Sequence, residues 1–261
     1  MIFRGAALLL ALLAAPVMAE CVVTMRLDSD PPYLMRKSDG SASGVNGDIA
    51  REALRRIGCS VEFREEPLGR ALKELQEGKL GVISDMFRTP EREAYALFSH
   101  TRNEVANRLY VRTGDKNRWT LASFADLPRQ GIRLGYESSS LASPDFQKVI
   151  DDPAFRTILF PIRTHEGLWR MLAAGRLDAV IMDELTARWE LAQFGLDQEI
   201  AATGFRASTD PAFFAFSRVS TEPAEVRRFD EAIAAMRRDG TLAAILTSYG
   251  LDPNAAVDVS E

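Results

Sequence analysis

This sequence has very little cysteine and histidine, two residue types that commonly build catalytic and metal sites. Its 261 residues include two cysteines and two histidines, and the histidines, His100 and His165, lack the spacing of a metal site. The Gly-x-Ser-x-Gly motif of a serine hydrolase is absent, and lysine and arginine form no cluster with interleaved aromatic residues. The formal net charge of −5 also has the wrong sign for nucleic acid. We therefore expect no metal, no cofactor, no catalytic residue and no nucleic-acid partner.

Long apolar runs are missing as well, apart from one near the N-terminus. Arg4 is followed by an apolar stretch from residue 6 to residue 15, and Val17-Met-Ala19 has the small-residue pattern of a secretory cleavage site. The run is about half of the ~20 residues that a membrane-spanning helix needs. We expect residues 1–19 to be a signal peptide. Glu20, directly before a cysteine, disfavours the alternative of a lipoprotein.

The two cysteines predict one disulfide, because exported chains form them readily. Cys21 opens a predicted strand at residues 22–27, and Cys59 opens another at residues 60–65. If these strands are parallel neighbours, their first residues lie side by side and a bridge between them is sterically possible. Two separate buried thiols are the alternative.

One sequence pattern occurs twice and predicts the architecture. Residues 75–85 (LQEGKLGVISD) and 172–183 (LAAGRLDAVIMD) each consist of a helix end, a glycine, a short apolar strand and an acid. This is the second half of a βαβ unit, so the repetition predicts an α/β protein with two similar lobes. Asp85 and Asp183 would follow the carboxyl ends of their strands, where open α/β sheets bind ligands. A cleft between the lobes is the expected site.

Apolar periodicity and helix-capping residues give the remaining elements. The predicted strands are 22–27, 60–65, 80–84, 109–112, 132–136, 158–162, 178–182 and 213–216, and the main predicted helices are 47–57, 67–77, 165–174, 184–194, 223–238 and 241–249. We assign residues 20–110 to the first lobe, 111–211 to the second, and 212–261 to a return that packs on the first lobe. Two chain crossings predict a hinge.

A few polar residues at strand and helix ends would suit a zwitterion. Arg92 follows the third strand, Ser138 and Ser139 open a predicted helix, and Asp183 follows the repeated strand. Arginine and a helix N-terminus suit a carboxylate, whereas an aspartate suits an ammonium group. An α-amino acid would satisfy all of them. Taken singly, an ordinary surface position is the commoner fate of an arginine or an aspartate.

Several segments have the order and spacing of a known family over essentially the whole mature chain. They are residues 31–33 (PPY), 44–49 (GVNGDI), 75–79, 89–92 (TPER) with 98–99 (FS), 123–127, 175–183 and the tail 236–249. In these segments the chain resembles the family 3 extracellular solute-binding proteins, which are the periplasmic amino-acid receptors of ABC transporters. The resemblance implies a type II periplasmic-binding fold with two mostly parallel, helix-flanked lobes and a two-segment hinge.

The resemblance also implies roles for individual residues. Arg92 would hold the ligand carboxylate and Asp183 its ammonium group, Ser138 and Ser139 would lie at the anion end, and Tyr33 would lie near the cleft rim. The implied protein is a periplasmic monomer that binds a small polar amino acid, or a similar zwitterion, and docks on a membrane permease.

Departures from the family pattern add negative charge around the expected cleft. Glu137 replaces the usual glycine before the serine pair, and Asp85 and Phe87 occupy a stretch that is one residue shorter than in the well-studied receptors. Together with Asp30, these acids would suit a cationic side chain such as that of lysine, arginine or ornithine. Solvated loop acids are the alternative. Arg70, at the start of a helix, could reach the cleft or only cover its own helix.

Two other functions stay open at this point. Some relatives on this scaffold are dehydratases, and catalysis would need a poised acid or base in the cleft. Others are sensor modules that pass closure to a membrane partner.

Overall fold

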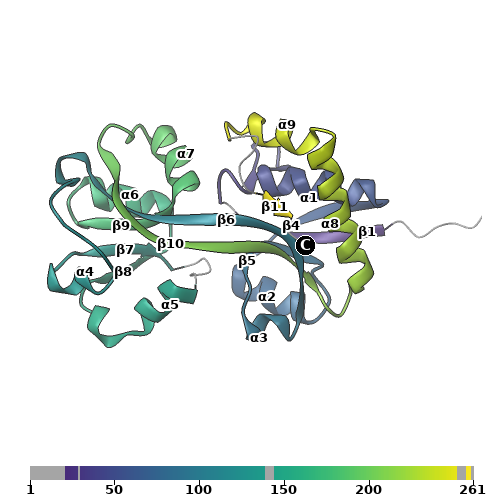
Figure 1. The fold of residues 1–261 in the computed structure, drawn as a ribbon, viewed down its shortest axis with the longest axis horizontal. Coiled ribbons are helices and arrows are strands. Elements are labelled where there is room, and N and C mark those ends of the chain that lie inside the picture. Colours follow the sequence, from purple (N-terminus) through teal and green to yellow (C-terminus); the bar gives the residue numbers. More distant parts are fainter. Residues whose placement is uncertain (1–20, 29, 139–143, 252–256, 260–261) are drawn as a thin grey trace, which may run out of the picture.

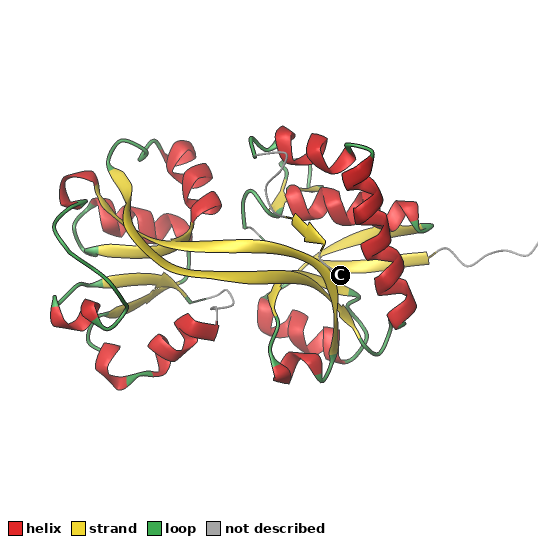
Figure 2. Ribbon diagram, viewed as in Figure 1, coloured by secondary structure: helices red, strands yellow, loops and turns green. Residues whose placement is uncertain are grey.

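The molecule consists of two lobes that are connected by two long strands (Figure 1). The computed structural model describes residues 21–28, 30–138, 144–251 and 257–259, and the predicted signal peptide lies outside them. In each lobe, helices flank a central sheet (Figure 2). No helix within the described ranges is long and apolar enough to cross a membrane. The predicted two-lobed α/β architecture is confirmed.

One hydrogen-bonded sheet runs through both lobes in the order β4-β1-β5-β10-β6-β9-β7-β8, and β11 pairs with β6. Its strands are β1 (Cys21–Leu27), β4 (Cys59–Glu65), β5 (Val82–Phe87), β6 (Ala96–Arg112), β7 (Leu134–Glu137), β8 (Leu159–Ile162), β9 (Ala179–Asp183), β10 (Ile200–Ser217) and β11 (Val257–Val259), with a separate β2 (Met35–Arg36) and β3 (Ala42–Ser43) pair. Neighbours β4, β1 and β5 are parallel, as are β9, β7 and β8. Each lobe is therefore mostly parallel, as predicted.

The α-helices are α1 (Val45–Arg56), α2 (Leu68–Gln76), α3 (Pro90–Glu93), α4 (Asp126–Arg129), α5 (Pro144–Asp151), α6 (His165–Ala173), α7 (Glu184–Phe194), α8 (Pro223–Arg238) and α9 (Thr241–Ser248). Helices α3, α6 and α7 begin at residues whose side chains cap them. Thr89 caps α3 by accepting from the amide of Arg92, and Thr164 caps α6 by accepting from the amide of Gly167. Helix α5 begins at Pro144, six residues later than the serine-rich start predicted at Ser138.

The C-terminal helices α8 and α9 pack on the first lobe. Phe229 of α8 lies edge-on to Phe214 and Phe216 of β10, with ring centroids 5.2 and 5.0 Å away. These rings share one core with the buried residues of α1 and β1. Separate apolar clusters in the second lobe give it a core of its own.

The two lobe crossings are longer strands than the sequence predicted. Strand β6 starts at Ala96 rather than near residue 109, and β10 starts at Ile200 rather than near residue 213. Long antiparallel pairing between them stabilises residues 200–212, which have no alternating apolar pattern, although the register shifts between Ala202 and Ser208. The predicted lobe boundaries at residues 111 and 212 fall inside these strands.

The predicted disulfide is present. Cys21 and Cys59 are register partners at the first positions of parallel strands β1 and β4, with their Cα atoms 4.5 Å apart. The bridge therefore joins two strand starts, at the opposite end of β1 from the residues that follow Leu27.

We expect the double substitution Cys21→Ser with Cys59→Ser to lower the free energy of unfolding by about 3 to 4 kcal/mol, because a cross-link between residues 38 apart in sequence restricts the unfolded chain. Urea titration followed by circular dichroism measures the change. Solute binding by the folded variant should match that of the unaltered protein, since the bridge is remote from the cleft. A variant as stable as the parent would contradict the estimate.

Candidate functional site

A cavity of about 150 Å³ lies between the lobes and is lined by both of them. This is about ten times the space that one water molecule needs, so a small solute can be enclosed. The first lobe contributes residues at and beyond the ends of β1 and β5 and the loop that contains Tyr33. The second lobe contributes the ends of β7 and β9 and the starts of α6 and α7. The predicted location at the carboxyl ends of parallel strands is therefore where the cavity is found.

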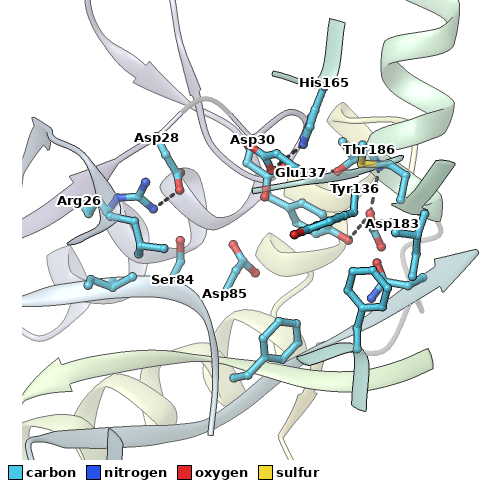
Figure 3. A pocket seen from close by; sticks show the side chains of 18 residues that line it. Arg26, Asp28, Asp30, Ser84, Asp85, Tyr136, Glu137, His165, Asp183 and Thr186 are labelled. Carbon is cyan, nitrogen blue, oxygen red and sulfur yellow. Dashed lines mark hydrogen bonds and ion pairs between the residues drawn. The ribbon is translucent and has the colours of Figure 1, made fainter. Parts of the chain in front are cut away.

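Asp183 connects the two lobes through its carboxylate. Its Oδ1 atom caps α7 by accepting from the amides of Leu185 and Thr186, both at 3.0 Å, and also accepts from the hydroxyl of Tyr33 at 3.0 Å. Tyr33 belongs to the first lobe. A second contact joins the same elements, because the Thr186 hydroxyl lies 3.4 Å from Oδ1 of Asp30. The lobes thus touch directly across one side of the cavity (Figure 3).

The Tyr33 loop is held by the N-terminus of α1. The amides of Val45 and Asn46 donate to the carbonyl oxygens of Pro32 and Tyr33, at 3.0 and 2.8 Å. Gly44 makes this approach possible, because its φ is +112° and a Cβ atom there would lie 2.5 Å from the Tyr33 carbonyl oxygen. The Tyr33 loop and the start of α1 therefore form one packed unit.

Asp85 lines the cavity and has a backbone conformation that is uncommon for a residue other than glycine. It lies in β5 with φ at +54°, the only positive φ of a non-glycine residue in the described part of the chain. The Nδ2 atom of fully buried Asn46 donates to its carboxylate. Backbone strain of this kind is typical of binding sites, where surrounding contacts maintain it.

Burial of the cavity acids changes their protonation. Burial raises the pKa of Asp30 well above its usual value, and the nearby charges of Asp28, Asp85 and Asp183 raise it further, against the effect of His165. Burial also raises the pKa of Asp183, although the hydrogen bonds from Thr186 and Tyr33 oppose the shift. The pKa of Asp28 is raised by burial despite the adjacent guanidinium of Arg26. Negative charge in this cavity is therefore costly without a cation.

Glu137, His165 and Glu190 form a buried ionic cluster on the second lobe. The Nε2 atom of His165 lies 2.9 Å from Glu137, which lines the cavity, and its Nδ1 atom lies 2.8 Å from Glu190, which does not. The indole nitrogen of Trp169 donates to the other oxygen of Glu190 at 2.7 Å. Burial alone would lower the pKa of His165, but hydrogen bonds and charges from both glutamates outweigh it and raise the pKa to about 10.

Most of the residues predicted for the site lie in the cavity lining. Those that do are Asp30, Tyr33, Asp85, Phe87, Glu137 and Asp183. Their contacts with a ligand stay predictions. Ser138 is exposed and donates to the carbonyl oxygen of Ile162, and Ser139 lies outside the described residues.

Two predicted arginines are placed elsewhere. Arg70 does not reach the cleft: its side chain is 69% exposed and pairs with Glu74 one helical turn away on α2, so it covers its own helix. Arg92 is half-buried and does not line the cavity. Its Nη1 atom donates to the carbonyl oxygen of Phe87 at 2.7 Å. Phe87 lines the cavity, so the guanidinium contacts a lining residue without lining the cavity itself.

Sequence reasoning missed several lining residues, among them Arg26, Asp28, Tyr136, His165 and Thr186. Asp28 follows the end of β1, so the strand-end rule that selected Asp85 could have selected it too. No such signal existed for His165, since its partners are 28 and 25 residues away in the sequence. Within the described ranges, no group of three or more histidine, cysteine or carboxylate side chains is arranged to hold a metal ion.

Comparison with known proteins identifies the family. A sequence model of the bacterial extracellular solute-binding proteins, family 3, matches residues 23–252, and the chain belongs to this family. The histidine-binding periplasmic protein of Salmonella typhimurium is 23% identical over 233 residues, which is 86% of each chain. A probable amino-acid ABC transporter-binding protein of Haemophilus influenzae is 23% identical over 223 residues, which is 85% of this chain and 81% of that protein.

Solved structures share the fold at low sequence identity. A histidine kinase sensor domain with similarity to periplasmic binding proteins has a TM-score of 0.73 and 19% identity over 88% of this chain and 95% of its own. An ancestral arginine-binding protein bound to arginine has a TM-score of 0.71 and 22% identity over 87% and 97%. An ancestral amino-acid-binding protein, a precursor of cyclohexadienyl dehydratase, has a TM-score of 0.70 and 20% identity over 87% and 95%.

We expect Asp30→Asn to raise the free energy of unfolding of the ligand-free protein by about 1 kcal/mol at pH 8, because it removes a buried charge. The pKa of Asp30 is raised in the folded state, so the ionised carboxylate destabilises the fold above that pKa. This destabilisation is absent below the pKa of the unfolded state, 3.8, where the carboxyl group is protonated in both states. The gain should therefore shrink as the pH falls towards 4. Urea titrations at pH 8 and pH 5 measure it, and an equal gain at both would contradict the assignment.

Proposed function

We propose that the protein captures a small amino acid with a cationic side chain in the periplasm and delivers it to an ABC transporter. The observation that carries this proposal is the charge of the cavity. The described lining residues include five carboxylates, those of Asp28, Asp30, Asp85, Glu137 and Asp183, against Arg26 and His165. With all of them ionised, the lining has an excess of three negative charges, so a guest with net positive charge is favoured over a neutral one.

The ammonium group of the ligand would bind beside Asp183. That carboxylate has a raised pKa from burial and is held by the α7 amides and the Tyr33 hydroxyl, so its geometry is fixed before a ligand arrives. A ligand in contact with Asp183 and with Asp85 would touch both lobes at once. Binding would therefore shift the population towards the closed arrangement.

Delivery to a transporter and a periplasmic location rest on the family and on the predicted signal peptide. Both relatives described above are named as binding proteins, one of them periplasmic and the other of an ABC transporter. Closure around the solute would provide the shape that a membrane permease recognises, and β6 and β10, which connect the lobes, would be the hinge.

A dehydratase-like enzyme is the less favoured function. The histidine in the lining would be the obvious general base, but both of its ring nitrogens are hydrogen-bonded to glutamates. With its pKa raised to about 10, the imidazole holds its proton at neutral pH and cannot accept another. Formation of product from a cyclohexadienyl acid by the purified protein would reverse this preference.

We expect the thermal unfolding midpoint of the protein to rise most with L-arginine, L-lysine or L-ornithine when the common amino acids are compared. We also expect Asp183→Asn to weaken binding of the strongest of these ligands about 30-fold or more. Asparagine caps helices as well as aspartate, so the variant should keep α7 and lose only the charge. Calorimetry measures the affinity, and circular dichroism checks the fold. Strongest binding of a neutral or acidic amino acid would refute the proposed ligand class.

Arg92 can be tested as the partner of the ligand carboxylate. For this role its guanidinium would exchange the Phe87 carbonyl oxygen for the ligand. We expect Arg92→Ala to weaken L-arginine binding about 30-fold or more, but to leave binding of agmatine, which is arginine without its carboxylate, nearly unchanged. Calorimetry with both ligands gives the two ratios. Equal losses for arginine and agmatine would assign Arg92 a purely structural role.

A further inference from the structure

The cluster of Glu137, His165 and Glu190 brings together three elements of the second lobe. Glu137 is the last residue of β7, His165 the first residue of α6, and Glu190 lies within α7. Glu190 is 4% exposed and is fixed from the other side by the indole of Trp169. Glu137 and His165 line the cavity, whereas Glu190 does not (Figure 3).

The hydrogen bonds determine the charge of the cluster. An ionised carboxylate only accepts hydrogen bonds, so a ring that is bonded to carboxylates through both nitrogens must carry a proton on each. His165 is therefore an imidazolium between two carboxylates, and the cluster has a net charge of −1. Because Glu190 is buried behind the histidine, the surplus negative charge is presented to the cavity by Glu137.

Acids of the first lobe face this end of the cavity. Burial raises the pKa of Asp28, and the charge of Glu137 adds to the shift, which places these carboxylates of opposite lobes within electrostatic range. The charge of His165 likewise acts on Asp30, whose pKa it lowers. Arg26 offsets part of this charge through its ion pair with Asp28. A cation between the lobes here would interact with carboxylates on both sides.

A purely structural account explains the cluster poorly. Replacing a buried ionic cluster by apolar residues of similar volume is often neutral or stabilising, so stability alone gives little reason to keep it. A rigid carboxylate in a binding cavity, in contrast, needs a donor that fixes its position. His165 supplies that donor to Glu137, and Glu190 keeps the ring charged and oriented.

We propose that Glu137 binds the cationic group of the ligand side chain, a guanidinium or an ammonium, opposite Asp28, and that His165 and Glu190 are positioning residues that hold Glu137 for this contact. The proposal rests on the proposed function and deepens it. It assigns the two cationic groups of one ligand to opposite ends of the cavity, the α-ammonium to Asp183 and the side-chain cation to Glu137.

The test compares L-arginine with L-citrulline, which has nearly the same shape but no side-chain charge. Calorimetry on the mature protein gives the citrulline-to-arginine ratio of dissociation constants for three variants. Glu137→Gln removes the recognised charge. His165→Gln with Glu190→Gln removes the two positioning groups together, so that neither the histidine nor the glutamate behind it is left without the other. Arg133→Gln with Asp178→Asn is the matched control, since this ion pair of the same lobe does not line the cavity.

We expect the ratio to fall about 30-fold or more in Glu137→Gln and about tenfold in the double glutamine variant, and to stay unchanged in the control. An unchanged ratio in Glu137→Gln, with arginine still bound by the parent, overturns the inference but not the proposed function. Binding of no cationic amino acid by the parent overturns both. A loss in the control variant equal to that in the double glutamine variant shows that His165 and Glu190 act only through stability.

A second measurement does not depend on any ligand. Nitrogen-15 NMR of the imidazole ring should show both nitrogens of His165 protonated at pH 7.5 in the ligand-free parent, and should show the neutral ring at a lower pH in Glu190→Gln than in the parent. A neutral ring in the parent at pH 7.5 overturns the positioning role.

Discussion

Carboxylates from both lobes share one small cavity, and this concentration of buried negative charge is the constraint on which the rest of the site depends. Removing a carboxylate from water costs several kcal/mol unless a cation or a set of donors replaces the lost hydration. The protein supplies such partners one by one: Arg26 to Asp28, the α7 amides and Tyr33 to Asp183, and His165 to Glu137. These partners fix the acids in place, and the described lining still holds five carboxyl groups against Arg26 and His165.

Closure uses the same groups. Tyr33 and Asp30 come from one short loop of the first lobe, and their partners Asp183 and Thr186 begin α7 in the second. The loop is packed against the N-terminus of α1 through Gly44, so it is part of the first lobe, and β6 and β10 connect that lobe to the second. A solute that contacts acids of both lobes would stabilise only the closed arrangement. Such a difference in affinity between two states is the condition for a ligand to shift a conformational equilibrium.

Local sequence patterns predicted much of the fold and only part of the site. The repeated helix–glycine–strand–acid pattern gave both lobes and placed Asp85 and Asp183 in the lining, because strand ends are fixed by local periodicity and sheet topology. The first half of β10 was missed because long antiparallel pairing with β6, rather than its own residues, keeps it extended. The ionic cluster was missed for the same physical reason: β7, α6 and α7 bring Glu137, His165 and Glu190 together only in the folded lobe.

The departures from the family pattern coincide with the costly features of the cavity. Asp85 has a left-handed backbone conformation, and Glu137 needs a buried imidazolium to hold it, whereas glycine would be free of strain at the first position and of charge at the second. Neither feature strengthens the empty protein. A ligand that binds only the folded state adds to the stability of that state. Under the proposed function, the charge of the solute explains these two residues, and the requirements of the fold do not.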